Sequence, residues 1–149
     1  MFPVKLRTAV LSSVCEAINA LRTDVMIADE DLNITSMNAS MQAMMCEAED
    51  DLWRDLKGFS AANLLGRNID LFHKTPLHQR KMLASLEHPH HATIRIGACA
   101  FDLLVTPLKE GNRSVGFAVE WADAKERLLN VEYAGQIAAI NRSQAAVTL

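Results

Sequence analysis

The hydrophobic residues of this chain change from helical spacing to strand alternation and back. The pattern predicts the order helix, two strands, several short helices, three strands, helix. An amphipathic helix is expected over 4–22, with the stripe Val10, Val14, Ile18 and Leu21. A similar stripe follows Asp123 and consists of Leu129, Tyr133, Ile137 and Ile140. Each stripe either binds other helices, in a dimer or in tandem, or folds back onto the sheet, and the sequence favours neither alternative.

The strands are short and joined by recognisable turns. An apolar run between acidic residues predicts a strand at 24–29, and a β-branched alternating segment predicts its hairpin partner at 32–37. Turns at Gly97-Ala98 and Glu110-Gly111-Asn112 separate three later strands. These are expected at about 91–97, 100–108 and 113–122. Consecutive strands with short turns predict an antiparallel sheet that packs the central helices on one face.

The central segment is expected to consist of short helices and turns. Asn38 is well placed to cap a helix that starts at Ala39, and we expect a break in that helix near Glu49. Gly66 closes a turn or a single helical turn at 60–66. Pro76 then favours the first turn of a new helix.

His73 is the most distinctive candidate for chemistry in this segment. It is expected in a tight turn directly after Leu71 and Phe72, and such apolar surroundings suit a neutral imidazole that ligates a metal or haem iron. The alternative is a hydrogen-bonded structural histidine. His78 is expected in the first turn of the next helix. Because Pro76 separates the two histidines, they do not share a helix face, and a two-histidine metal site is not expected.

Composition narrows the class of protein. The 149 residues suffice for one domain with a core, and half of them are hydrophobic. No apolar run approaches the ~18 residues of a membrane span, and the N-terminal segment lacks a signal-peptide pattern. The net charge of −3 gives no reason to expect nucleic-acid binding. The three scattered cysteines favour a reducing, cytoplasmic compartment.

Other clusters have simpler interpretations. The histidines around Pro89 (His88, His90 and His91) indicate a solvated loop rather than a metal site. The methionines between 37 and 45 are interpreted as adaptable core residues, with a cofactor pocket as the alternative. No constellation of nucleophile, base and oxyanion donor is recognisable, nor is a glycine-rich phosphate loop, so an enzyme is the least favoured class.

Over about 24–125 the predicted order resembles that of PAS domains. The segment Asn68 to Arg80 (NIDLFHKTPLHQR) is similar to the Asp-x-Phe-His-Lys-x-Pro-x-His-Gln segment of PAS domains in bacterial methyl-accepting chemotaxis proteins. These include the aerotaxis-type receptors, whose PAS domain binds b-type haem and senses oxygen. The resemblance implies an α+β PAS fold, with a five-stranded antiparallel sheet, short helices on one face and flanking N- and C-terminal helices.

The resemblance also implies the roles of individual residues. His73 maps onto the haem-iron ligand, Leu103 onto the distal wall, and Trp121 onto the tryptophan that stabilises bound oxygen. Trp121 lies in an alternating strand, so it faces the core if Phe117 and Val119 do. Further apolar wall is expected from Ile27, Ile69 and Phe72.

The resemblance extends to the exit of the last strand. Many PAS sensors carry Asp-x-Thr there, and Asp123 matches the aspartate, whereas Lys125 replaces the threonine. The implied signal passes from Trp121 through Asp123 into the following helix and on to a signalling domain of a longer receptor. We therefore expect an N-terminal linker helix at 1–23, a PAS sensor at 24–123 and a C-terminal signalling helix at 124–149.

The leading hypothesis is a cytoplasmic haem sensor of oxygen or another diatomic gas, which forms a homodimer through its terminal helices. The alternative is a haem-free PAS module for dimerisation or for binding another small ligand. A flavin-binding PAS domain is a third possibility, and no residue of the chain favours it.

Overall fold

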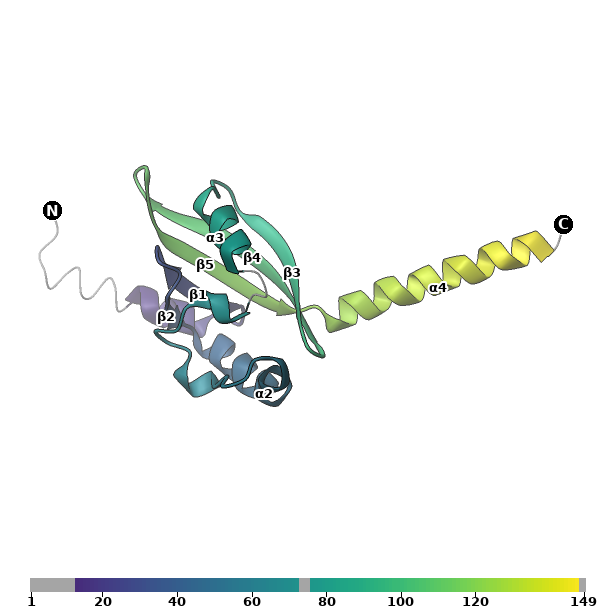
Figure 1. Cartoon of the computed structure of the whole chain (residues 1–149), viewed down its shortest axis with the longest axis horizontal. Coiled ribbons are helices and arrows are strands. Elements are labelled where there is room, and N and C mark those ends of the chain that lie inside the picture. The colour runs from purple at the N-terminus through teal and green to yellow at the C-terminus, as the bar shows by residue number, and fades with distance from the viewer. Residues whose placement is uncertain (1–12, 73–75, 148–149) are drawn as a thin grey trace, which may run out of the picture.

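The computed structural model describes residues 13–72 and 76–147, which form a five-stranded antiparallel sheet with helices (Figure 1). The strand order is β2-β1-β5-β4-β3. The strands are β1 (Asp24–Asp29), β2 (Ile34–Met37), β3 (His90–Ile96), β4 (Cys99–Glu110) and β5 (Arg113–Asp123). The helices are α2 (Ala39–Asp55), η1 (Ala61–Asn63), η2 (Ile69–Phe72), α3 (Pro76–Ala84) and α4 (Lys125–Val147), and residues 13–20 are also helical. The predicted fold class and all five strands are confirmed.

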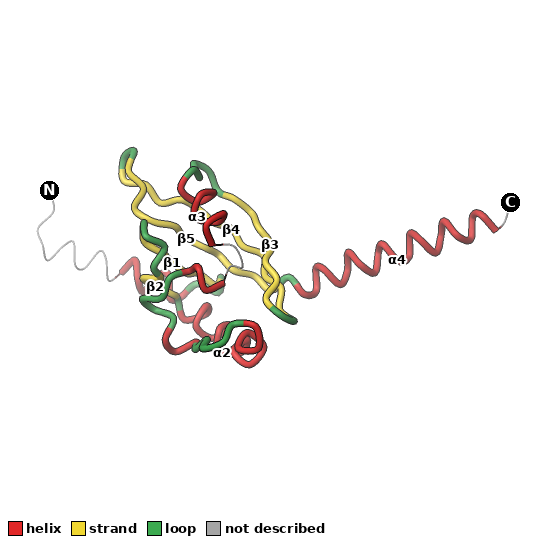
Figure 2. The backbone as a smooth tube through the Cα atoms, viewed as in Figure 1, coloured by secondary structure: helices red, strands yellow, loops and turns green. Residues whose placement is uncertain are grey.

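Figure 2 shows the helices, strands and loops along the backbone. The helices α2, η1, η2 and α3 follow β2 in the chain and precede β3. One face of the sheet carries the buried residues of β4 and β5, which form a single core with residues of α2, η2 and α3. The intervening residues point to the opposite face, which remains partly exposed. The sheet therefore has an inner face covered by the short helices and an outer face open to solvent.

Helix α2 is continuous, so the predicted break near Glu49 is wrong. The segment contains no proline or glycine, and Met41, Met45 and Leu52 maintain one buried stripe along it. The Glu49 carboxylate accepts a hydrogen bond from the Ala61 N–H at 3.1 Å, so this side chain joins α2 to η1 without interrupting the helix.

Asn38 caps α2 as predicted and also joins three segments. Its Oδ1 accepts hydrogen bonds from the backbone N–H groups of Met41 and Val25, each at 3.0 Å. Its Nδ2 donates to the carbonyls of Thr23 at 2.7 Å and Ile18 at 3.1 Å. The side chain is buried with each of its polar atoms bonded, and it fixes the approach of the 13–20 helix to β1 and α2.

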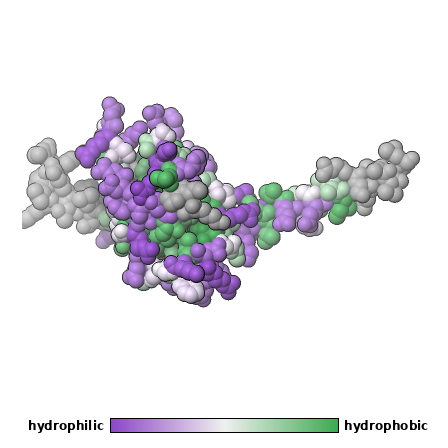
Figure 3. Space-filling model, viewed as in Figure 1, coloured by the Kyte–Doolittle hydropathy of each residue, from purple (hydrophilic) through white to green (hydrophobic). Residues whose placement is uncertain are grey.

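Helix α4 extends away from the sheet, and the helix at 13–20 lies at the opposite end of the molecule (Figure 1). Of the two alternatives left open for the C-terminal stripe, the structure therefore does not show the one in which it folds back onto the sheet (Figure 1). Its residues Leu129, Tyr133, Ile137 and Ile140 are exposed, and Figure 3 shows hydrophobic atoms on this part of α4. No helix within the described ranges is both long and apolar enough to cross a membrane.

Candidate functional site

The inner face of the sheet encloses an apolar cavity of about 120 Å³ between the strands, η2 and α3. Its walls include Ile69 and Phe72 of η2 and Leu103 of β4, as the sequence predicts. Among the residues around the cavity that the structure describes there is no carboxylate, lysine or arginine. This environment favours an apolar ligand with few polar atoms.

Trp121 of β5 faces this cavity and is only 5% exposed. Phe117 and Val119 are buried on the same side of the strand, so the predicted inward orientation is confirmed. The indole ring packs edge-on against Phe72 and Phe101, with ring centroids 5.2 and 5.3 Å away. These contacts hold the ring in a fixed orientation at the cavity wall.

The indole Nε1 of Trp121 is buried and has no hydrogen-bond partner among the described residues. An indole nitrogen donates one hydrogen bond and accepts none, and a buried donor without a partner is unfavourable. The cavity therefore offers one oriented donor to an acceptor atom of a bound molecule. Leu103 is the register partner of Trp121, so the two side chains form adjacent parts of the same wall.

Ile27 does not line the cavity, and its neighbour Met26 does. Met26 is buried on the inner face, whereas Ile27 is half-buried on the outer face, where it pairs with Ala118. The expectation that Ile27 forms part of the wall is wrong by one residue. Successive residues of a strand point to opposite faces, and the uninterrupted apolar sequence of β1 hides which set points inward.

His73 lies outside the described residues, so its predicted role stays a prediction. The structure describes both flanking elements, η2 and α3, and an ion pair joins them. Arg80 Nε donates to Asp70 Oδ2 at 2.8 Å, and Arg80 Nη2 bonds the same oxygen. His78 lies in the first turn of α3 as predicted, is exposed, and is not part of the cavity wall.

Three polar residues at the cavity, Gln79, His90 and Thr93, were missed by sequence reasoning. His90, expected in a loop, begins β3 and lines the cavity together with Gln79 of α3. Ala92 and Ile94 line the cavity as well. His90 lies two residues before Ala92 and four before Ile94, so the alternation of a strand that includes His90 would have placed all three on one face. Of the predicted methionine group, Met37, Met41 and Met45 are core residues outside the cavity wall.

Comparison with known proteins places this architecture in a family. No protein-family model matches the chain. A stretch of 111 residues, 74% of the chain, is 43% identical to the methyl-accepting chemotaxis protein McpB of Pseudomonas aeruginosa. The chain spans only 16% of the length of that protein.

Solved structures resemble the chain over most of its length. The Aer2 receptor of Vibrio cholerae, described as a dual PAS-heme oxygen sensor, is 31% identical with a TM-score of 0.62, over 68% of this chain and 93% of that one. An RNA-binding light-oxygen-voltage receptor is 18% identical with a TM-score of 0.61, over 93% and 39% of the two chains. The PAS domain of Bordetella pertussis BvgS is 15% identical with a TM-score of 0.54, over 91% and 98%. The last two support the fold alone. The chain belongs to the PAS domain family, a family of sensor domains that are not enzymes.

Proposed function

We propose that the chain is the sensory PAS domain of a bacterial chemotaxis receptor, which binds b-type haem through His73 and responds to oxygen or another diatomic gas. The indole N–H of Trp121, which has no partner among the described residues and is held against an apolar cavity, is the observation that carries this proposal. The similarity to McpB and to the Aer2 oxygen sensor supports it.

The residues around the cavity have the chemistry that a haem site needs. A bound haem would supply gas-binding iron chemistry, and the His73 imidazole would hold the iron. Phe72, Ile69 and Leu103 give the cavity an apolar wall, which is unfavourable for water. The Trp121 N–H donates a hydrogen bond to an acceptor in the cavity, and an acceptor atom with partial negative charge gains most. This preference favours oxygen over carbon monoxide.

The size of the cavity sets a requirement for haem loading. At about 120 Å³ it is smaller than the ~300 Å³ at the lower end of pockets for drug-sized ligands. We infer that Gln79, Met82 and Leu83 of α3 move away from the sheet when haem enters. Of these, only Leu83 is fully buried, and the unbranched Met82 side chain adapts readily to a new contact surface.

The output of this sensor is α4. Its exposed stripe at Leu129, Tyr133, Ile137 and Ile140 pairs with the same helix of a second copy, so that the sensor acts as a homodimer. The N-terminal segment 1–23 serves as the entry helix. The sensor comprises 24–123, and the signalling helix comprises 124–149. The helix passes the signal to a downstream domain of the same receptor in the cytoplasm.

The dimensions of the cavity favour a second candidate, a haem-free PAS module. In this case the cavity keeps its present size and holds a small apolar molecule with one acceptor atom bonded to Trp121 Nε1.

An absorption spectrum distinguishes the two candidates. The purified protein is measured as isolated and after addition of haem, then reduced under nitrogen and exposed to oxygen. The haem proposal expects a Soret band that shifts on oxygenation. The band should be lost in His73→Ala and kept in the matched control His78→Ala, because His78 is exposed on α3. A featureless spectrum, or a fully loaded His73→Ala variant, would refute ligation by His73, and the featureless spectrum would leave the haem-free module.

A further inference from the structure

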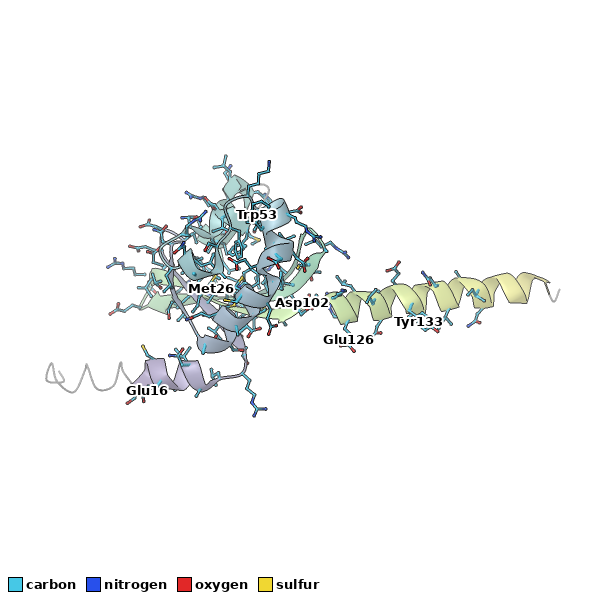
Figure 4. All side chains as sticks on the ribbon, turned by 90° about the horizontal axis from the view of Figure 1, so that it is seen from below. Glu16, Met26, Trp53, Asp102, Glu126 and Tyr133 are labelled. Atoms are coloured by element: carbon cyan, nitrogen blue, oxygen red, sulfur yellow. The ribbon has the colours of Figure 1, made fainter. Side chains whose placement is uncertain are left out.

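A cluster of three polar side chains on the outer face of the sheet joins β3 and β4 to α4. Arg127 Nε donates to Asp102 Oδ2 at 2.8 Å, and Arg127 Nη2 donates to Asp102 Oδ1 at 2.7 Å. The Thr93 hydroxyl donates to Asp102 Oδ1 at 2.7 Å and accepts from Arg127 Nη2 at 3.3 Å. We call Thr93, Asp102 and Arg127 the outer-face cluster. Figure 4 shows Asp102 on the sheet close to the first turn of α4, where Glu126 is labelled.

The geometry of the cluster is that of a specific contact. The planar guanidinium of Arg127 bonds both carboxylate oxygens of Asp102, a two-point arrangement that fixes orientation as well as distance. The hydrogen bonds from Arg127, and then that from Thr93, lower the pKa of the Asp102 carboxyl. In the described part of the chain this is the only ion pair between α4 and the sheet.

The cluster lies directly behind the cavity wall. Thr93 and Asp102 are register partners on β3 and β4. Their neighbours Ala92, Ile94 and Leu103 line the cavity, and Thr93 itself is also among the residues around it. Because successive residues of a strand point to opposite faces, a shift of either strand at the cavity also shifts the Asp102 carboxylate that α4 contacts.

The other hydrogen bonds between the β5–α4 junction and the sheet come from backbone N–H groups. The Ala124 N–H donates to the Ala100 carbonyl at 2.9 Å. The Lys125 N–H donates to Asp123 Oδ1 at 2.8 Å, a bond that any residue except proline supplies at this position. The side chain of Lys125 has no part in that bond. Within the described residues, Arg127 is thus the residue of α4 whose side chain hydrogen-bonds β3 and β4.

We propose that the outer-face cluster couples the cavity to α4, so that α4 responds to movements of β3 and β4 as well as of β5. This inference rests on the proposed output through α4. It adds a second route beside the direct chain connection at Asp123, and it assigns Arg127 and Asp102 as positioning residues that contact no ligand.

Hydrogen exchange tests the coupling without any ligand. Leu103→Ala perturbs the cavity wall next to Asp102, and the amides of 125–132 report on the first turns of α4, with those of β1 as the internal reference. In the otherwise unchanged chain, Leu103→Ala should raise the exchange rate at 125–132 relative to β1 by about threefold, a factor typical of a modest side-chain coupling. In an Arg127→Ala background this factor should fall to about one.

Two further variants make the result specific. Asp102→Asn should act like Arg127→Ala, because it removes the other half of the ion pair. Arg113→Ala should leave the threefold factor unchanged, since Arg113 is exposed and its contact to Glu30 is at 3.9 Å. The proposal would be overturned if Leu103→Ala raised the exchange rate at 125–132 by the same factor with and without Arg127. It would also be overturned if Leu103→Ala left that exchange rate unchanged.

The outcome is separable from that of the proposed function. Haem uptake is read from the Soret band, and Arg127→Ala should load haem as the unchanged chain does, because Arg127 lies outside the cavity wall. A chain that takes up no haem contradicts the gas-sensor proposal. The exchange experiment still shows whether the outer-face cluster couples the cavity to α4.

Discussion

The two faces of β4 and β5 are built from alternate residues of the same strands and differ in every physical respect. Leu103 and Trp121 point to the inner face, where they are buried around an apolar cavity. Asp102 points to the outer face, where an exposed ion pair holds it to α4. Burial contributes most of the stability, whereas exposed ion pairs contribute little. The inner face should therefore govern folding and ligand binding, and the outer face should govern how the domain communicates with its helix.

Truncation of Trp121 should have the largest effect on the inner face. Trp121→Ala removes a ring that packs against Phe72 and Phe101 and should lower the free energy of unfolding by about 3–5 kcal/mol. Urea unfolding followed by circular dichroism measures this change. A loss below 1 kcal/mol would mean that the inner face does not dominate stability in the way that its burial indicates.

A pair of neighbours on β1 tests the difference between the faces directly. Met26→Ala should cost about 2–5 kcal/mol because Met26 is buried on the inner face. Ile27→Ala should cost clearly less, because its side chain is half-buried on the outer face. The two unfolding curves are measured under the same conditions. Equal losses would show that the outer face is packed as tightly as the inner one.

This pair also shows where sequence reasoning succeeded and where it ended. The alternation of β5 favours an inward Trp121, because the residues on its face (Phe117, Val119) are large and apolar while those between them are small or charged (Ala118, Glu120, Ala122). In β1 the run Val25-Met26-Ile27-Ala28 is apolar throughout, so its direction depends on pairing with β5, which the sequence of β1 alone does not contain. The strands and the Asn38 cap follow from local chemistry and were predictable for that reason.

Long-range contacts explain the remaining differences. Helix α2 is continuous because Met41, Met45 and Leu52 stay on one buried stripe that packs into the core, and Glu49 instead bonds the backbone of Ala61, a residue 12 positions later in the chain. The position of His90 at the cavity depends on β3 pairing with β4. The outer-face cluster combines residues 93, 102 and 127 from three elements, and no spacing within the sequence predicts that they meet. The haem-ligand role of His73 is implied by the resemblance, and the absorption spectra test it.

Trp121→Phe separates the packing of Trp121 from its hydrogen bond. The substitution keeps an aromatic ring at the inner face and removes an N–H that has no partner in the described structure, so stability should change by no more than about 1 kcal/mol. In the haem-loaded protein, oxygen affinity should fall by about tenfold, the factor that corresponds to one hydrogen bond to a charged acceptor. Oxygen titration of the reduced protein measures the change. Unaltered affinity would remove Trp121 from the proposed site.

The smallest effect is expected on the outer face and is best resolved by pH. Arg127 and Thr93 lower the pKa of Asp102 below its usual value of 3.8. A carboxyl with a lowered folded-state pKa contributes stability above its unfolded pKa and loses it as the pH falls through the folded pKa. The stability difference between the unchanged chain and Asp102→Asn should therefore be fully present near pH 7 and shrink progressively below about pH 5.

Urea unfolding midpoints of the two proteins over this pH range give the difference. Added salt should reduce it, since the ion pair is exposed. His91 also lowers the pKa of Asp102 through its charge, so the series is repeated in a His91→Gln background. A difference that persists unchanged below the lowered pKa would show that Asp102 acts through packing and not through its charge. In that case the contrast between an apolar inner face and an ionic outer face would no longer explain how α4 is held to the sheet.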